Sequence, residues 1–283
     1  MISIICPNYN NTRNVIKNIE LLDSSGVEYQ LIIVDDGSHD YSLLHKFSSS
    51  RILVLQNRSA NSAGKCRNIG LNYIRFPWTI FLDADDTIDI FQLKNIICER
   101  NVYTEGIPDI IFTPPMSKKI DGSVSKRHRP YSKLVNDYFK YGAEDLRYWY
   151  HVPWGKIYYS DFLKESKIKF SECIVSNDVE FSLHTGMSAK KVLVSDICYY
   201  CVIESSSSLT KQISSSNLRL RRDVLIRYNT ILIDNSLNKY IIPLCKLDFR
   251  LLVNGSFNSF LLKDIFIRSF YPSFYYLKSK LRK

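Results

Sequence analysis

The sequence predicts an α/β protein built on a doubly wound, mainly parallel sheet flanked by helices, with a helical extension at the C-terminus. Apolar segments of strand length alternate with segments of helical periodicity through the first hundred residues, which is the pattern of parallel βαβ units. Two of the apolar segments end abruptly on carboxylates, as buried strands do where they open into solvent. The excess positive charge lies in a separate C-terminal region.

The elements of the first half follow from their residue patterns. Strands are predicted at residues 2–6, 31–34, 52–55 and 78–82, because these segments are short and apolar. Helices are predicted at residues 12–22, 63–74 and 90–100, and a polar turn at residues 7–11 precedes the first of them. Strands joined by helices run parallel, and their carboxyl ends meet at one edge, where ligands bind in open α/β sheets.

The strand at residues 78–82 ends on Asp83, Ala84, Asp85 and Asp86, three acids within four residues. Like charges this close repel one another, so a compensating cation is the natural physical explanation. Oxygen ligands favour Mg²⁺ or Mn²⁺, and these ions commonly bridge a protein carboxylate to substrate phosphates. The alternative is that Asp86 caps the helix that follows, a role for which one acid suffices.

A second acidic strand end follows residues 31–34, where Asp35 and Asp36 precede Gly37 and Ser38. In a parallel sheet, both acidic ends face one crevice. The sequence has neither a G-x-G-x-x-G fingerprint nor a Walker loop, which argues against the usual dinucleotide and ATP sites. The crevice is therefore predicted to handle a nucleotide's phosphates through a metal ion, while the second acidic pair holds ribose hydroxyls.

Composition and cysteine usage favour a cytoplasmic globular protein. The N-terminal segment has no basic leader, and no run reaches the roughly 18 apolar residues of a membrane span. The seven cysteines are odd in number and scattered, which does not resemble a disulfide framework. Cys198 and Cys201 form a CxxC without a second pair, so burial in a strand is favoured over a metal or redox site.

The net charge of +10 is unevenly distributed. Residues 1–204 carry 24 basic and 24 acidic side chains, whereas residues 205–283 carry 14 basic and 4 acidic ones. A neutral body with a basic appendage suits an anionic membrane surface or nucleic acid. Apolar residues recur with helical spacing at 256–283, and Pro272 should split that segment into two helices. We expect them to lie on the cytoplasmic membrane face; packing on the body of the protein is the alternative.

Four motifs follow one another through the first half. They are Pro7-Asn8-Tyr9-Asn10, Val34-Asp35-Asp36-Gly37-Ser38, Cys66-Arg67-Asn68-Ile69-Gly70 and Phe81-Leu82-Asp83-Ala84-Asp85-Asp86. Each motif is a weak signal by itself. In this order and at these spacings, they resemble the inverting family 2 glycosyltransferases, which have a GT-A fold.

Three further segments extend the resemblance to about residue 212. Residues 153–158 and 176–182 look like acceptor-side segments of bacterial members that build capsule or lipopolysaccharide sugars. Residues 205–210 resemble the serine-rich stretch that follows the last strand in that subgroup. The resemblance implies a GT-A-like domain at residues 1–212, with a nucleotide-sugar-binding half at 1–110 and an acceptor-binding half at 111–212. Residues 213–283 would form the basic, aromatic-rich helical extension.

The implied function is metal-dependent, inverting transfer of a hexose-type sugar. The donor would be a nucleoside diphosphate sugar, with UDP expected, and the acceptor a glycan or polyprenyl-diphosphate-linked glycan of a bacterial surface polysaccharide. The enzyme would be cytoplasmic and peripheral on the inner membrane face, without binding nucleic acid. Two alternatives differ in class. A nucleotidyltransferase acting on sugar phosphates usually has a glycine- and lysine-rich phosphate loop, and a basic nucleic-acid-binding protein would not place an acidic crevice against phosphates.

The resemblance also implies roles for the residues of the donor side. Asp85 would coordinate Mn²⁺ or Mg²⁺, which neutralises the diphosphate, and Asp83 would lie near the ribose or a metal-bound water. Pro7, Tyr9 and Asp35 would hold the nucleoside.

The remaining roles concern proton transfer and the acceptor. Asp178 would be the general base, favoured as the anion at a helix N-terminus; a plain N-cap is the alternative. Asn177 and Trp154 would bind the acceptor, unless Trp154 belongs to the core. Arg67 would contact the diphosphate or brace the acidic loop. His184 is an outside candidate for a metal ligand.

Two positions depart from the family pattern. Ser62 stands where many relatives have a glycine, so the resemblance does not carry over a close backbone approach there, whereas Gly64 is kept. Asn177 stands where more distant members have glutamate before the catalytic aspartate, and Asp178 is kept. The basic, turn-rich segment at residues 118–129 is expected to form a loop over the acceptor side, either a lid or a solvated loop without a role.

Overall fold

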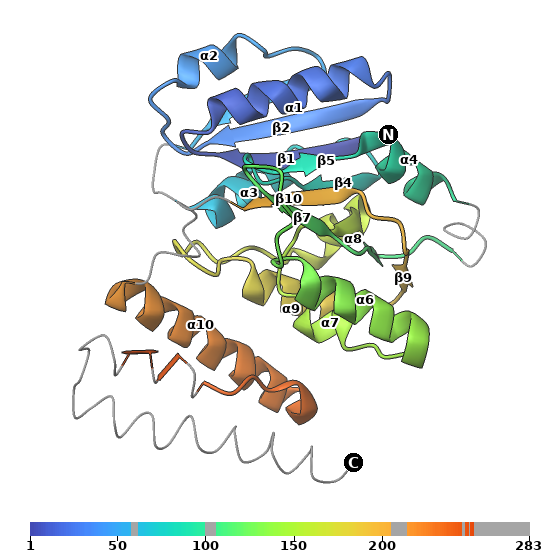
Figure 1. Cartoon of the computed structure of the whole chain (residues 1–283), viewed down its shortest axis with the longest axis vertical. Coiled ribbons are helices and arrows are strands. Elements are labelled where there is room, and N and C mark those ends of the chain that lie inside the picture. Colours follow the sequence, from blue (N-terminus) through green and yellow to red (C-terminus); the bar gives the residue numbers. More distant parts are fainter. Residues whose placement is uncertain (58–61, 100–105, 205–213, 245–246, 249, 252–283) are drawn as a thin grey trace. The chain divides into compact units, whose positions relative to one another are not determined.

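The computed structural model describes residues 1–57, 62–99, 106–204, 214–244, 247–248 and 250–251. The chain divides into two compact units, Met1–Ser205 and Ser206–Lys283 (Figure 1). Within the described residues, each helix is too short or too polar to cross a membrane. The helices expected at residues 256–283 lie outside the described residues, so their membrane role stays a prediction.

A seven-stranded sheet forms the centre of the first unit, in the order β3-β2-β1-β4-β8-β6-β9. Its strands are β1 (Ile2–Asn8), β2 (Tyr29–Asp35), β3 (Ile52–Gln56), β4 (Trp78–Phe81), β6 (Ile110–Phe112), β8 (Lys156–Tyr159) and β9 (Val192–Val194). β1 lies parallel to β2 and to β4, and β2 lies parallel to β3. The register sets Asn8 opposite Asp35, so the polar ends of β1 and β2 lie side by side.

The four predicted strands are all present and parallel, which confirms the predicted α/β class. Every residue of β1, β2 and β4 is buried, because a parallel sheet is covered on both faces. β8 is antiparallel to both β4 and β6, and β6 pairs in parallel with β9. The sheet is therefore mainly parallel, with one reversed strand that joins its two halves.

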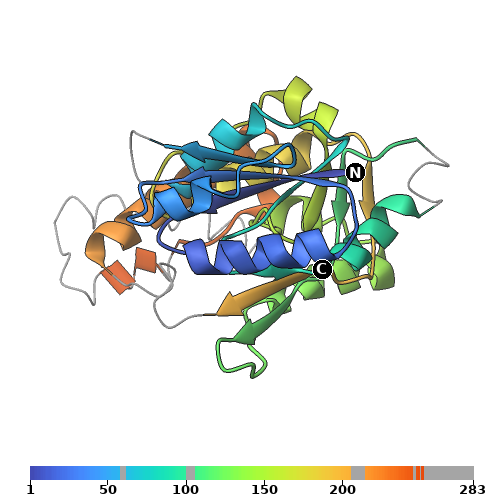
Figure 2. The same cartoon turned by 90° about the horizontal axis from the view of Figure 1, so that it is seen from above.

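Helices cover both faces of the sheet. The helices of the first half are α1 (Thr12–Ser24), α2 (Tyr41–His45), α3 (Ala63–Leu71) and α4 (Ile90–Cys98). Ile4 of β1 belongs to a core shared with α1 and α4, whereas Ile5 belongs to a second core shared with α3. Successive strand residues point to opposite faces, which is why neighbours in the chain enter different cores. Figure 2 shows α1 lying along one face of the sheet.

A small second sheet follows the acidic cluster. It contains β5 (Thr87–Ile88), β10 (Tyr200–Glu204) and β7 (Met116–Lys119), with β10 in the middle. β10 is antiparallel to β5 and parallel to β7. The loop expected at residues 118–129 is wrong in its first part, because residues 118–119 belong to β7. The hydrogen bonds that make this segment a strand come from β10, which is remote in the sequence.

The described residues from 111 to 204 add four helices, α6 (Arg129–Tyr141), α7 (Leu146–Trp149), α8 (Ser160–Ser166) and α9 (Val179–Ser188). α6 begins with Pro130 in its first turn and ends at Gly142, whose φ of 64° suits glycine. α9 begins directly after Asp178, which agrees with the helix N-terminus expected at that residue. Phe181 of α9 packs in the same core as Ile5 and α3, so α9 also covers the α3 face of the sheet.

The described part of the second unit centres on α10 (Ser215–Asp234), followed by a short 3₁₀ helix, η2 (Asn238–Tyr240). Ser214 caps α10 by accepting a hydrogen bond from Asn217 N at 3.1 Å. Arg222 Nε donates to Asp248 Oδ1 at 2.6 Å, and both side chains are buried. This ion pair holds the returning chain against α10.

Candidate functional site

The acidic cluster forms the loop between β4 and β5, at the carboxyl end of a central strand. Asp83 is partly exposed, Asp85 is half-buried and Asp86 is buried. The three neighbouring acids therefore differ in environment, and only Asp83 and Asp85 offer carboxylates to a ligand.

Asp86 is a structural residue. Its carboxylate accepts hydrogen bonds from Tyr200 Oη at 2.9 Å and from Ile203 N at 2.8 Å. The hydroxyl oxygen of Tyr200 also accepts a hydrogen bond from Asp83 N at 3.0 Å. β10 thus fixes the shape of the acidic loop.

The alternative in which Asp86 caps the following helix is wrong. Asp89 is the capping residue of α4, and its Oδ1 accepts hydrogen bonds from Phe91 N and Gln92 N, both at 3.0 Å. Because the short strand β5 separates the cluster from the helix, the cap lies three residues further on than expected.

The charge of Asp85 is only partly compensated within the chain. Burial and then the charge of Asp83 raise the pKa of Asp85 to about 6, while Arg127 acts in the opposite direction. No group of three or more His, Cys, Asp and Glu side chains among the described residues is arranged to hold a metal ion alone. Mg²⁺ sites commonly take one or two protein carboxylates and complete their shell with water and substrate phosphates. The carboxylates of Asp83 and Asp85 fit that kind of site. Among the described residues, His184 belongs to no group of three or more potential metal ligands.

Arg67 of α3 joins the acidic loop to the segment before α9. Its Nη2 donates to Asp83 Oδ1 at 2.6 Å, and its Nη1 donates to Asn177 Oδ1 at 2.8 Å. The guanidinium is only 5% exposed and lies over the ring of Phe170, 5.2 Å from the ring centroid. These contacts fit the bracing alternative for Arg67, and they direct the Asn177 side chain at Arg67.

Asp178 occupies the N-cap position of α9, but its side chain makes no capping hydrogen bond. The plain N-cap alternative therefore does not account for this carboxylate. Burial raises the pKa of Asp178; the charge of Asp83 also raises it, while Arg67 and Lys156 lower it. Asp178 thus shares one electrostatic environment with the Arg67–Asp83 pair.

The loop before α9 is docked on α3. Asn68 donates to Phe170 O at 2.9 Å and accepts from Phe170 N at 2.8 Å, and Ser62 Oγ donates to Cys173 O at 3.1 Å. A Cβ on Gly64 would lie 2.1 Å from Ser171 O, so only glycine allows this close packing. Gly64 and Ser62 both serve contact between α3 and this loop.

The ends of β1 and β2 form a hydrogen-bonded turn around Asp35. Asp35 is fully buried, and its carboxylate accepts from Asn8 Nδ2 at 2.7 Å and from Ser38 N at 2.8 Å. Pro7 is buried in β1, whereas the Tyr9 side chain is 52% exposed beside this turn. Of the three residues assigned to the nucleoside, Tyr9 alone presents a freely accessible side chain, and Asp35 shapes the turn that presents it.

Trp154 lies in the core, with 3% exposure. One face of its indole stacks on Tyr200, with 5.9 Å between centroids and 21° between planes, and Tyr131 approaches edge-on at 4.9 Å. The structure places Trp154 according to the core alternative. Its contact with Tyr200 supports the side chain that fixes Asp83 and Asp86.

Two side chains of the site were not predicted from the sequence. Tyr200 is one, because nothing in its apolar run marks a contact with an acidic loop more than a hundred residues away. Lys156 is the other: it is 1% exposed, its Nζ donates to Tyr150 O at 2.6 Å, and it lies 5.4 Å from the ring centroid of Phe112. Burial lowers the pKa of Lys156 to about 7, and Asp178 opposes that shift. A lysine at the start of a short apolar strand was the available signal.

The six described cysteines are free thiols. Cys201 lies in β10 and Cys198 just before it, and burial raises the pKa of both. Cys201 is thus a strand residue, as favoured above, whereas Cys198 lies two residues before the strand, and both side chains are half-buried.

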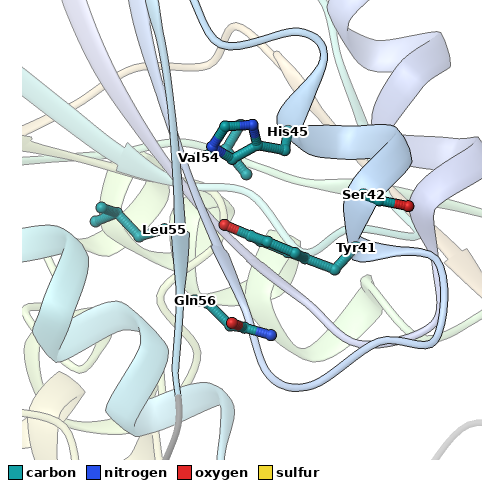
Figure 3. Close-up of a pocket in the computed structure, with 6 residues that line it drawn as sticks. All are labelled: Tyr41, Ser42, His45, Val54, Leu55 and Gln56. Carbon is teal, nitrogen blue, oxygen red and sulfur yellow. The ribbon is translucent and has the colours of Figure 1, made fainter.

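A hollow elsewhere on the first unit lies between α2 and β3. Figure 3 shows its lining, which consists of Tyr41, Ser42, His45, Val54, Leu55 and Gln56. β3 is one of the two edge strands of the large sheet, and none of the acidic-loop residues lines the hollow. The acidic loop therefore remains the candidate site.

A parallel β3-β2-β1-β4 core, a reversed strand beside it and carboxylates at the carboxyl end of β4 define a GT-A-like fold. The chain belongs to glycosyl transferase family 2, because the family model, described as "Glycosyl transferase family 2", matches residues 3–155, more than half of the chain.

Similar proteins include two bacterial transferases. The poly(ribitol-phosphate) beta-N-acetylglucosaminyltransferase TarS of Staphylococcus aureus strain MW2 is 27% identical over 207 residues, covering 70% of this chain and 35% of TarS. The UDP-Glc:alpha-D-GlcNAc-diphosphoundecaprenol beta-1,3-glucosyltransferase WfgD of Escherichia coli is 35% identical over 89 residues, covering 30% of this chain and 35% of WfgD. The chain spans about a third of the length of these two relatives.

Solved structures share the fold at low sequence identity. S. aureus TarS 1–349 in complex with UDP-GlcNAc has a TM-score of 0.64 at 20% identity, covering 89% of this chain and 71% of that one. The mannosyltransferase PcManGT of Pyrobaculum calidifontis, in complex with GDP-Man and Mn²⁺, has a TM-score of 0.55 at 12% identity, covering 93% and 74%. These likenesses support the GT-A-like fold.

Proposed function

We propose that the chain is a metal-dependent inverting glycosyltransferase. It moves a hexose-type sugar from a nucleoside diphosphate donor to a hydroxyl of a glycan or polyprenyl-diphosphate-linked acceptor in bacterial surface polysaccharide synthesis, of the capsule or lipopolysaccharide type. The observation that carries the proposal is that one site contains both a pair of carboxylates suited to a metal ion and a separate carboxylate suited to accept a proton. Asp83 and Asp85 repel each other at the end of β4, and Asp178 is left unused by its own helix.

UDP is the proposed nucleotide. WfgD is named for a UDP-Glc donor, and TarS was solved with UDP-GlcNAc, which supports a UDP sugar over the GDP-Man bound to PcManGT. We place the nucleoside against the turn that Pro7, Tyr9 and Asp35 form. There the exposed ring of Tyr9 offers a surface to the base, while Asp35 keeps the turn in shape.

Mn²⁺ or Mg²⁺ is the proposed cofactor, held by Asp85. Such an ion would supply positive charge to the departing nucleoside diphosphate. Asp83 stays next to Asp85 because Arg67 and Tyr200 fix its side chain and its backbone, and it would orient the ribose or a metal-bound water. The Mn²⁺ bound to PcManGT supports the choice of ion.

Asp178 is the proposed general base. Inversion requires an in-line attack by an acceptor hydroxyl, and the base must take its proton. The raised pKa of Asp178 makes its anion a stronger base, while Arg67 and Lys156 favour that anion. On the acceptor side, Asn177 would act through its contact with Arg67, and Trp154 through its support of Tyr200.

The extension at residues 213–283 is proposed to hold the enzyme on the inner face of the cytoplasmic membrane. Its support is the concentration of basic and aromatic residues there. The test is vesicle flotation of the full chain and of a chain that ends near Asn254. Equal flotation of both, or of neither, contradicts the proposal.

The function is tested by incubating the full chain with a panel of nucleotide sugars, Mn²⁺ and lipid-diphosphate-linked acceptors. We expect release of UDP together with a new glycosidic bond of inverted configuration. A nucleotidyltransferase would instead release pyrophosphate from a nucleoside triphosphate and a sugar phosphate. That product, or the absence of turnover with every donor, would overturn the proposal.

A further inference from the structure

A hairpin of the first unit carries apolar side chains at its tip. The chain turns back after β7 at residues 120–124, where Ile120 is 73% and Val124 is 74% exposed. Lys119 N donates to Ser123 O at 2.8 Å, and Gly122 N donates to Lys119 O at 2.9 Å. The turn is thus ordered by its own hydrogen bonds, which hold two aliphatic side chains in solvent.

Basic residues surround this tip. Residues 116–129, called the β7 hairpin below, contain five basic residues and a single acid, Asp121. The carboxylate of Asp121 accepts a hydrogen bond from Ser123 N at 2.8 Å. On the neighbouring strand β10, Glu204 accepts a hydrogen bond from Ser125 Oγ, so this acid is also engaged. The exposed basic residues are Lys118, Lys119, Lys126 and Arg129, and Met116 adds a further partly exposed apolar side chain.

We propose that the β7 hairpin docks on the anionic surface of a lipid bilayer, with Ile120 and Val124 entering the headgroup region. Interfacial segments combine apolar side chains that enter the membrane boundary with basic side chains that meet anionic lipids. A polyanionic glycan phosphate would pair with the lysines, but it would gain nothing from two exposed aliphatic side chains. The combination of exposed aliphatic and basic side chains therefore favours a bilayer.

The β7 hairpin is connected to the candidate site by pairing within one unit. β7 pairs with β10, and Tyr200, the first residue of β10, contacts both Asp83 and Asp86. Figure 2 shows the green hairpin projecting beside the orange strand β10 at the lower edge of the view. A bilayer bound at the hairpin would set the position of the acidic loop relative to the membrane, independently of the C-terminal extension.

The first test measures contact at the tip itself in the full chain. Ile120→Trp and Val124→Trp are mixed with vesicles of phosphatidylcholine and phosphatidylglycerol that have brominated acyl chains, and the signal of the wild-type tryptophans is subtracted. Leu21→Trp is the matched control, because Leu21 is 55% exposed on α1. We expect quenching at positions 120 and 124, and little at position 21. Absence of quenching at the tip, or equal quenching at all three positions, overturns the proposal.

The second test separates lipid from other anions. The double variant Ile120→Glu/Val124→Glu should lower flotation with phosphatidylglycerol vesicles several-fold, whereas Leu21→Glu should not; circular dichroism checks the fold of each variant. Competition by inorganic polyphosphate without any tip quenching would identify a polyanion site and refute lipid docking. Because these measurements read binding and not turnover, their failure is distinguishable from failure of the proposed transfer reaction.

Discussion

Arg67 and Asp83 form an ion pair at 2.6 Å in which the guanidinium is 5% exposed and the carboxylate 28%. The same guanidinium donates to Asn177, the residue before Asp178. One cation of α3 therefore fixes both the loop proposed to meet the leaving group and the segment that presents the proposed base. An in-line displacement requires the leaving group and the base to be held at a fixed distance from each other. The buried Arg67 would set that distance, because it contacts both segments.

Arg67→Lys should disturb this bracket without removing its charge. An ammonium group lacks the planar fork that reaches two partners at once, so one of the two contacts is lost. We expect a loss of about 1–3 kcal/mol in the free energy of unfolding, the range for an unsatisfied buried partner. Denaturant unfolding measures it. Lys65→Ala is the control on the same helix: Lys65 pairs with the exposed Glu172 at 3.7 Å, and its loss should cost under about 1 kcal/mol. Equal losses would contradict the bracket.

Asp85 should destabilise the metal-free protein at neutral pH. Its folded pKa is about 6, above the unfolded value of about 3.9, so the folded state binds more protons between these values. The contribution of Asp85 to the free energy of unfolding is therefore most favourable at low pH, and it is lost as the pH rises from about 4 to 6. In EDTA at neutral pH, Asp85→Asn should be more stable than the wild type by about 1–3 kcal/mol, and the difference should vanish below about pH 4.

Urea unfolding across this pH range measures the difference. Asp89→Ala is the control with the opposite sign, because it removes the α4 cap and should cost about 1 kcal/mol at neutral pH. A metal-free Asp85→Asn that is less stable than the wild type at neutral pH would show that the Asp85 charge is compensated within the chain.

Activity should depend on a divalent ion and on Asp85. Without the ion, the departing diphosphate lacks its counter-charge, so Asp85→Ala should abolish transfer while circular dichroism and unfolding remain those of a folded protein. Transfer assays with excess EDTA, followed by re-addition of Mn²⁺, provide the measurement. Undiminished turnover in EDTA rules the metal role out.

The sequence predicts the local part of this site and misses the part made by distant contacts. A strand that stops on Asp83 and Asp85 is visible in nine consecutive residues, because apolar burial and charge change at one point. The bracket from Arg67 to Asn177 spans 110 positions, and the bond from Tyr200 to Asp83 spans 117. Such contacts depend on which strands become neighbours in the sheet, and the local residue pattern does not determine the strand order.

The same limit explains the revised assignments. Asp86 looks like its two acidic neighbours in the sequence, and it differs only because β10 pairs with β5 and brings Tyr200 to it. Trp154 is compatible with a sugar platform until Tyr200 and Tyr131 are seen to cover it. The burial of Lys156 could not be predicted for the same reason, because the rings that surround its ammonium group belong to Phe112 and Tyr150 in other parts of the chain.

Asp178→Asn should separate proton transfer from donor binding. The amide keeps the size of the side chain but cannot accept a proton, so transfer should fall by about 10² or more while donor affinity stays nearly unchanged. In the wild type, kcat/KM should rise with pH through the pKa of Asp178, which burial raises from its usual value. Titration of donor binding and a pH profile of transfer are the measurements. Collapse of donor affinity with near-normal turnover would make Asp178 a donor ligand instead.

Gly64→Ala should uncouple α3 from the loop that carries Asn177 and Asp178. The new Cβ would lie 2.1 Å from Ser171 O, a backbone atom that no side-chain rotation can move. Alanine favours a helix over glycine by about 1 kcal/mol, so a net loss of stability would report the clash and not the helix. Moving the loop would also misalign Arg67 with Asn177. We therefore expect transfer to fall further than donor binding does.

Gly70→Ala provides the comparison on the same helix. Its Cβ would lie 2.6 Å from Ile5 Cγ2, so it overpacks the core beneath β1 and leaves the loop alone. Overpacking should cost about 1–3 kcal/mol of stability, without a selective loss of transfer in the fraction that remains folded. Unfolding curves, donor titration and kcat measured for both variants decide the matter. If Gly64→Ala keeps full transfer and stability, the close approach between α3 and the loop does not position the base.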